Sequence, residues 1–281
     1  MRDSPGDCGL RCGRLPRRAN NVCYKIAQLN LVSNTVTMSG SAVRFAGVDK
    51  NYGRAKALRG VTFDVARGDF FGLIGVNGAG KTTLLKCLLD FCNITGGKID
   101  IFGTPHHVTA ARARLAFLPE RFNPPYYLTG EDFIRYVLGM QSTPYDRAAA
   151  ERMLHGFDLD VAALKLPVRS YSKGMTQKLG LAACLLSRKD LYVLDEPSSG
   201  LDPKARALLK TQLQELKKQA RTVLFTSHAL ADVAEICDRL AIIHAGTLRF
   251  AGTPAALCAE YASDNLEQAF LRCIDGVVQS A

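Results

Sequence analysis

The sequence predicts an α/β fold in which a mostly parallel sheet is covered by helices on both faces. Short unbroken apolar runs at 70–74, 191–194, 223–225 and 240–243 are typical of strands that are buried on both sides of a parallel sheet. Segments with helical periodicity separate these runs along the chain. Strands that alternate with helices in this way indicate an α/β core.

Two segments ahead of the first apolar run have the two-residue period of half-buried antiparallel strands. Val43 and Phe45 alternate with polar neighbours, and so do Val61, Phe63 and Val65. These segments predict an antiparallel β subdomain beside the parallel sheet.

Helical periodicity follows the first and second buried runs and returns near the end of the chain. Apolar residues at helical spacing are Leu84, Leu85, Leu88 and Leu89, then Leu208, Leu209, Leu213 and Leu216, and last Leu266, Ala269, Phe270 and Ile274. The middle group follows Asp202-Pro203, a typical helix start. The stretch of about 121–186 has no comparable buried run, so we expect a helical subdomain inserted into the core there.

Composition excludes several classes of protein. With 281 residues, 47% apolar and 22% charged, the chain is too long and too apolar to be disordered. No run approaches the roughly 20 consecutive apolar residues that a membrane-spanning helix needs. The net charge of +10 suits anionic partners, whether nucleotides, nucleic acid or a phospholipid surface.

The N-terminal segment and the cysteines bear on where the protein works. Residues 1–37 carry six basic and two acidic side chains, a net charge of +4, without a sustained period. We expect 1–41 to be a disordered extension or an over-long gene start with the true start at Met38, and a basic arm that touches lipid headgroups is the alternative. The nine cysteines form no CxxC pair, which favours free thiols in a reducing cytoplasm, and no secretory signal is recognisable.

The strongest chemical signal lies between the buried run 70–74 and the helix that begins near residue 81. Residues 75–82 match GxxxxGK[ST], whose glycines let backbone N–H groups turn toward phosphates at a helix N-terminus. Lys81 is expected to reach the β and γ oxygens and the Thr82 hydroxyl to bind Mg²⁺. The fold is therefore predicted to be a P-loop NTPase core. The predicted nucleotide-binding residues here are Gly75, Val76, Asn77, Gly78, Ala79, Gly80, Lys81, Thr82 and Thr83.

Two acids follow the apolar run 191–194. In open α/β sheets, ligands bind at the carboxyl ends of the strands, where Asp195 and Glu196 are expected to lie. Asp195 can hold Mg²⁺ directly or through water, and Glu196 can orient or deprotonate an attacking water. Together with residues 75–82, the phosphate loop, this pair predicts hydrolysis of the nucleotide.

Further motifs resemble the ATP-binding subunit of an ABC transporter. Tyr171-Ser172-Lys173-Gly174-Met175 resembles the LSGGQ signature of this family, and Ser199-Gly200-Leu201-Asp202 resembles its D-loop. His228 follows an apolar strand as the family's switch histidine does, and Tyr52 matches the aromatic residue that stacks on adenine. The resemblance covers about residues 43–253.

The resemblance implies a domain organisation and an assembly. An ABC ATPase domain is expected at 42–253, with its helical subdomain at about 121–186, followed by a short helical tail at 254–281. Ser172 and Gly174 would contact the ATP that is bound by the opposite subunit, so the active unit would be a homodimer with two ATP molecules between its subunits. ATP and Mg²⁺ are the implied cofactors, and His228 would contact the γ-phosphate and help to hold the attacking water.

Two positions depart from the family pattern. Glu120 stands where the family usually has a glutamine that contacts Mg²⁺ and senses the membrane partner. Compared with glutamine, the carboxylate of Glu120 still offers an oxygen ligand, lacks the amide N–H donor and adds a negative charge. We therefore expect Glu120 on the metal side of the site. In the signature, Lys173 and Met175 replace a glycine and a glutamine. Both departures resemble ATPase subunits that drive export-type permeases.

The leading hypothesis is a Mg²⁺-dependent ATPase that powers a separately encoded integral-membrane permease, an exporter, through dimer closure. It would sit on the cytoplasmic face of the membrane, with the loop 120–127 near the permease. The alternative is a soluble ABC ATPase that acts on nucleic acid or ribosomes, which the charge of +10 invites. Ribosome-type members usually carry two such domains, and repair-type members carry a long coiled coil. The sequence shows one such domain and no extended heptad tract, so no nucleic-acid partner is expected. A regulatory ATP-binding module with little turnover is a third possibility, against which Lys81, Asp195, Glu196 and His228 argue.

Overall fold

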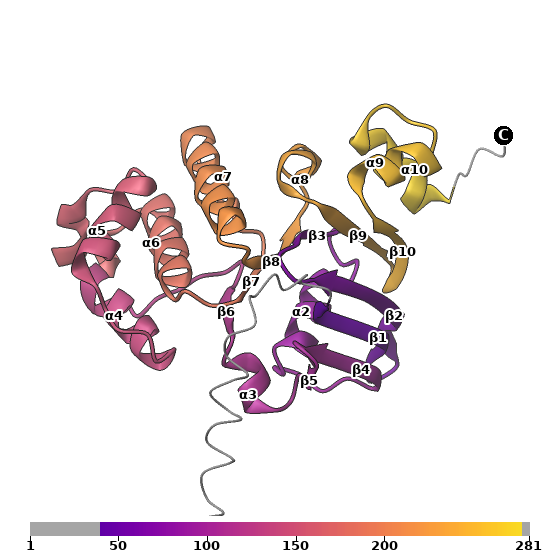
Figure 1. The fold of residues 1–281 in the computed structure, drawn as a ribbon, viewed down its shortest axis with the longest axis horizontal. Helices are drawn as coiled ribbons and strands as arrows, with labels where there is room; N and C mark the ends of the chain where they lie inside the picture. The colour runs from indigo at the N-terminus through magenta and orange to yellow at the C-terminus, as the bar shows by residue number, and fades with distance from the viewer. Residues whose placement is uncertain (1–39, 277–281) are drawn as a thin grey trace, which may run out of the picture. The chain divides into compact units, whose positions relative to one another are not determined.

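The computed structural model describes residues 40–276, in which the chain forms two sheets and the helices around them (Figure 1). The expected N-terminal extension therefore lies outside the described residues, apart from its last two positions, and so do the last five residues of the expected tail.

The larger sheet has six strands in the order β10-β9-β3-β8-β7-β6. Neighbouring strands from β6 to β9 run parallel, and β10 is antiparallel to β9. The strands are β3 (Phe70–Ile74), β6 (Leu115–Leu118), β7 (Leu191–Leu194), β8 (Thr222–Ser227), β9 (Arg239–His244) and β10 (Thr247–Gly252). β3, β7, β8 and β9 coincide with the four apolar runs of the sequence, which confirms the predicted parallel core.

The smaller sheet has four antiparallel strands in the order β2-β1-β4-β5. They are β1 (Ser41–Tyr52), β2 (Ala55–Ala66), β4 (Gly96–Ile101) and β5 (Thr104–Pro105). The alternating residues of the sequence lie opposite one another, Val43 beside Val65 and Phe45 beside Phe63. Their apolar faces are fully buried or nearly so, which explains the two-residue period.

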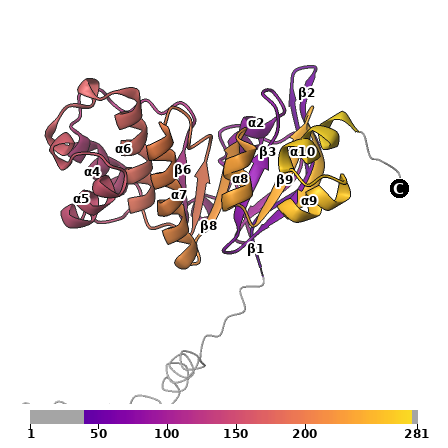
Figure 2. The ribbon, with the colours of Figure 1, turned by 90° about the horizontal axis from the view of Figure 1, so that it is seen from above.

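Both faces of β3 are covered, by different elements. Phe70 and Ile74 pack in one apolar cluster with residues of α7 and α8, whereas Phe71 and Leu73 pack in a second with α2 and the antiparallel sheet. Figures 1 and 2 show α7 and α8 on the opposite side of the parallel sheet from α2. The helices outside the segment 121–186 are α2 (Lys81–Leu88), α3 (Thr109–Arg112), α7 (Pro203–Lys218), α8 (Leu230–Ile236), α9 (Pro254–Glu260) and α10 (Leu266–Asp275).

The segment between β6 and β7 is helical. It holds α4 (Gly130–Met140), α5 (Arg147–Gly156), the short 3₁₀ helices Val161–Lys165 and Val168–Ser170, and α6 (Lys173–Leu186). Each α-helix begins after a polar residue whose side chain accepts a hydrogen bond from a backbone N–H of the first turn: Thr129, Asp146 and Ser172. In Figure 1 these helices lie together at the end of the parallel sheet that β6 forms.

The six cysteines of the described residues are free thiols, as the sequence predicts. Within residues 40–276, no helix combines the length and the apolar character that crossing a membrane requires.

Candidate active site

Four neighbouring parallel strands bring most of the predicted site residues to one edge of the sheet. The phosphate loop follows β3, Glu120 follows β6, Asp195 and Glu196 follow β7, and His228 follows β8. A cavity of about 600 Å³ opens there, lined by residues 76–83 together with Ala57, Glu120, Glu196, Ser199 and His228. The carboxyl ends of the strands therefore form the ligand-binding edge that open α/β sheets use.

Two glycines of the loop are required by its geometry. A Cβ atom at Gly75 would lie 2.3 Å from the carbonyl oxygen of Ile243 in β9, so any side chain there displaces the loop. Gly80 has φ +114°, a conformation that L side chains rarely adopt, and it is the residue from which α2 begins. The N-terminus of α2 thus opens directly onto the loop, with the positive end of the helix dipole toward the cavity.

Lys81 is held inside the loop. Its side chain is buried, and its Nζ donates to the carbonyl oxygens of Gly75 at 2.5 Å and Val76 at 3.4 Å. Burial lowers the pKa of Lys81, whereas nearby carboxylates, Glu196 foremost, act in the opposite direction. The nearest of them, Oε1 of Glu196, lies 4.0 Å from Nζ. The ammonium group therefore stands where an anion in the cavity would meet it.

Asp195 is buried among hydroxyl groups. Its Oδ1 accepts from the Thr226 hydroxyl at 2.6 Å, and its Oδ2 accepts from the Thr82 hydroxyl at 3.4 Å. Burial raises the pKa of Asp195, the hydrogen bond from Thr226 lowers it, and the negative charge of Glu120 raises it. A cation near the carboxylate would favour its ionised form.

The donor set fits Mg²⁺, which prefers oxygen ligands. Thr82 and Glu120 line the cavity, and Asp195 lies behind them, joined to Thr82 by its hydrogen bond. In the described part of the chain, no group of three or more His, Cys, Asp or Glu side chains is placed to hold a metal ion. A Mg²⁺ ion here would need further oxygens, and the phosphates of a nucleotide are the usual source.

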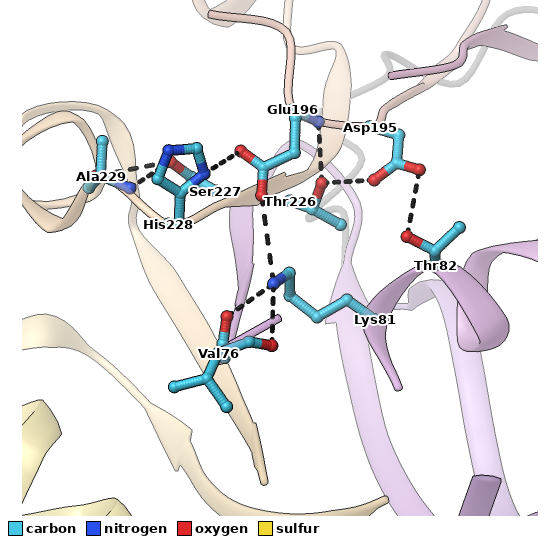
Figure 3. Close-up of polar contacts among 10 residues, drawn as sticks. Val76, Lys81, Thr82, Asp195, Glu196, Thr226, Ser227, His228 and Ala229 are labelled. Carbon is cyan, nitrogen blue, oxygen red and sulfur yellow. Dashed lines mark hydrogen bonds and ion pairs between the residues drawn. The ribbon is translucent and has the colours of Figure 1, made fainter. Parts of the chain in front are cut away.

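Glu196 connects the loop to His228 (Figure 3). Its Oε2 lies 2.8 Å from Nδ1 of His228, and its Oε1 faces Lys81. An ionised carboxylate only accepts hydrogen bonds, so Nδ1 is then the donor. Glu196 is buried, whereas the side chain of His228 is 69% exposed at the rim. The arrangement presents one buried carboxylate between two cationic or hydrogen-bonding groups.

Tyr52 lies at the end of β1, outside the residues that line the cavity. Its ring is half exposed, its hydroxyl donates to Sγ of Cys92 at 3.6 Å, and the Nζ of Lys50 lies 4.7 Å from the ring centroid. The hydrogen bond to Cys92, with burial, raises the pKa of Tyr52 to about 12.

The signature segment does not line the same cavity. Ser172 is exposed, and its hydroxyl accepts from the Met175 N–H at 3.2 Å as the N-cap of α6, with Gly174 in the first turn. A second cavity of about 460 Å³ borders this segment and shares Glu120 and Ser199 with the first. Ser172 and Gly174 therefore do not line the cavity in which their own chain would bind a nucleotide.

Two residues of the site were missed from the sequence. Thr226 bonds to Asp195 and also accepts from the Glu196 N–H at 2.8 Å, and its signal is a hydroxyl at the end of an apolar run. Ala57 lines the cavity from β2, and no sequence signal singles it out.

Comparison with known proteins decides the family. A sequence model of the ABC transporter family matches residues 58–199, about half of the chain. The chain belongs to this family. An uncharacterised ABC transporter ATP-binding protein of Nostoc sp. is 40% identical over 70% of this chain and 60% of its own length. The Nod factor export ATP-binding protein of Paraburkholderia xenovorans is 36% identical over 79% of this chain and 74% of its own length.

Solved structures agree with this assignment. An ABC transporter ATP-binding subunit matches with a TM-score of 0.73 and 28% identity, over 83% of this chain and 99% of its own. The family and its α/β P-loop fold are therefore confirmed. The chain spans about 60% of the length of the Nostoc relative.

Proposed function

We propose that the protein is the ATP-binding and ATP-hydrolysing subunit that powers a separately encoded membrane permease, an exporter, through ATP-dependent closure of a homodimer. The observation that carries the proposal is the gathering of Lys81, Asp195, Glu196 and His228 around the cavity at the end of β3. A family member that bound ATP without hydrolysing it would need the phosphate loop but would not need Glu196 and His228.

The phosphate loop and Lys81 bind the phosphates of ATP. Lys81 now bonds to two neutral carbonyl oxygens, and phosphate oxygens are stronger acceptors because the bond is then charge-assisted on both sides. The backbone N–H groups at the N-terminus of α2 add further donors. Tyr52, at the end of β1, contacts the base of the nucleotide.

Thr82, Asp195 and Glu120 hold Mg²⁺ together with the nucleotide. The ion would neutralise charge on the phosphate oxygens of ATP. Asp195 keeps its orientation through the Thr226 hydroxyl, while Thr82 reaches from the loop toward it. Glu120 supplies a carboxylate in place of the family's glutamine amide and so adds negative charge on the metal side.

Glu196 accepts a proton from the attacking water or orients it. The carboxylate is fixed on one side by Nδ1 of His228 at 2.8 Å and faces Lys81 on the other at 4.0 Å. A base held in this way costs little reorganisation when the water attacks. The exposed ring of His228 leaves Nε2 for the γ-phosphate.

Ser172 and Gly174 serve the ATP of a second subunit. Ser172 is exposed at the N-terminus of α6, outside the cavity of its own chain, and a helix N-terminus with an exposed hydroxyl suits a phosphate group. A homodimer with two ATP molecules between its subunits would bring each signature segment to the nucleotide of its partner.

The loop 120–127 is the proposed contact with the permease on the cytoplasmic face of the membrane. Its Tyr126 and Tyr127 are 67% and 69% exposed, and exposed aromatic side chains are typical of interfaces. The loop starts at Glu120, which lines the ATP cavity, so a change at the nucleotide can reach the loop directly. The relative named for Nod factor export supports an exporter.

The test of the enzymatic part is steady-state phosphate release by the full chain. Mg²⁺-dependent turnover that is abolished by Lys81→Ala and by Glu196→Gln supports the proposal. Lys86→Ala is the matched control, because Lys86 is an exposed lysine of the same helix and does not line the cavity. A rate that Glu196→Gln leaves unchanged would favour a site in which Glu196 has no role in hydrolysis.

A further inference from the structure

One buried hydroxyl contacts both acids of the proposed site. Thr226 lies in β8 with no solvent exposure, and β8 runs parallel to β7 with Leu194 paired to Phe225. The next residues along the two strands are Asp195 and Thr226, so the threonine lies beside the first acid. Its place is fixed by the sheet and not by a loop.

The Thr226 hydroxyl makes two hydrogen bonds with different directions. It donates to Oδ1 of Asp195 at 2.6 Å and accepts from the backbone N–H of Glu196 at 2.8 Å. A threonine hydroxyl has a single proton, so giving it to the carboxylate leaves a lone pair for the amide. One side chain therefore fixes the side chain of Asp195 and the backbone of Glu196 at once (Figure 3).

The bond to Glu196 stabilises an unusual backbone conformation. Glu196 has φ +49°, in the left-handed region that residues other than glycine seldom occupy. Such conformations persist only where the surroundings hold them. With the backbone in this conformation, the buried side chain faces Lys81 and His228.

We infer that Thr226 is a positioning residue for hydrolysis, which holds Asp195 oriented toward Mg²⁺ and Glu196 oriented toward the attacking water. The inference rests on the proposed ATPase function. Groups that orient a metal ligand typically change metal affinity or activity about 10- to 100-fold when they are removed. Thr226 orients a metal-side carboxylate and a proposed base together.

The test uses Thr226→Val, which keeps the branched shape and removes the hydroxyl, and Thr226→Ser, which keeps the hydroxyl. We expect Thr226→Val to lower kcat about 10- to 100-fold with the KM for ATP nearly unchanged, and Thr226→Ser to recover most of the rate. Thr226→Ala is the second hydroxyl-free variant, should valine prevent folding, and it is expected to lose the same activity.

Thr222→Val is the matched control. Thr222 is a buried threonine of the same strand, and its hydroxyl accepts from the Gly68 N–H at 2.9 Å, at the opposite end of β8 from the site. We expect this variant to lose thermal stability to a similar degree while its kcat stays that of the unchanged protein. If Thr226 had only a structural role, Thr226→Val and Thr222→Val would have the same kcat.

A binding measurement separates this inference from the proposed function. Mg²⁺ is titrated into protein that carries a fluorescent ATP analogue, and Thr226→Val is expected to need about 10- to 100-fold more Mg²⁺ while metal-free nucleotide binding stays the same. Normal Mg²⁺ dependence and normal kcat in Thr226→Val, or failure of Thr226→Ser to recover activity, would overturn the inference. Absence of any Lys81-dependent turnover in the unchanged protein would instead overturn the proposed function, and the titration would still test Thr226.

Discussion

Gly75→Ala tests whether the phosphate loop depends on its close approach to β9. The new Cβ atom would lie 2.3 Å from the carbonyl oxygen of Ile243, about 1 Å short of the 3.4 Å at which ordinary contact begins. The obstacle is the backbone of β9, which is paired on both sides, so the loop has to move and not β9. Since the Gly75 carbonyl also accepts from Lys81, the movement disturbs the lysine as well.

The magnitude follows from the cost of overpacking. Forcing extra volume into a well-packed region costs about 1–3 kcal/mol, which lowers the Tm of a domain of this size by roughly 2–12 °C. We also expect ATP affinity to fall roughly tenfold or more, because a loss of about 1.4 kcal/mol in binding corresponds to a factor of ten. Differential scanning fluorimetry and titration with a fluorescent ATP analogue measure the two effects.

Gly139→Ala is the control for this prediction. Gly139 lies on the exposed face of α4, and an added Cβ meets no atom within 4 Å. Alanine in place of glycine within a helix stabilises it by about 0.5–1 kcal/mol. The Tm of this variant should rise and its ATP affinity should not change. The reasoning would be refuted if Gly75→Ala left both the Tm and the ATP affinity unchanged.

Three further predictions concern other parts of the molecule. Glu196→Gln should lower kcat about 10²- to 10⁴-fold and preserve ATP binding, because the amide cannot take a proton; phosphate release measures this, and a normal rate would contradict it. Ser172→Ala removes the N-cap of α6 and should lower the free energy of unfolding by about 1 kcal/mol, which a denaturation experiment measures. Its ATP turnover should also fall, because the hydroxyl serves the ATP of the partner subunit. A loss of stability without a loss of turnover would argue against that role. Burial raises the pKa of Cys184 to about 12. At pH 8 a maleimide should therefore label the partly exposed Cys92 and Cys258 first and leave Cys184 unmodified, which mass spectrometry measures. Early labelling of Cys184 would contradict its burial.

The parallel core could be predicted from sequence because burial on both faces leaves a direct record. Runs such as Phe70–Ile74 and Leu191–Leu194 carry no charged residue, and in the structure both lie in the six-stranded sheet. The phosphate loop is similarly local, since its turn, its lysine and the start of α2 occupy one continuous segment. Features that depend on neighbours along the chain were therefore recognisable.

Features that depend on distant neighbours were not. Thr226 is 31 residues from Asp195 in sequence, and only the pairing of β7 with β8 makes it a partner of that carboxylate. The positive φ of Glu196 is imposed by the same surroundings and has no signature in residue type. Ala57 lines the cavity because the antiparallel sheet packs beside the loop, a contact between segments that the sequence alone does not connect.

The central claim is that ATP-dependent closure of this subunit acts on a membrane permease. The most direct measurement is purification of tagged Glu196→Gln from detergent-solubilised native membranes with ATP and Mg²⁺, with the co-purifying chains identified by mass. Tagged Lys81→Ala under the same conditions is the control for nucleotide dependence. We predict a stoichiometric multi-span membrane protein with Glu196→Gln. Recovery of soluble protein or nucleic acid alone, from a preparation that retains ATP-dependent dimers, would contradict the claim and favour an ABC ATPase that acts away from the membrane.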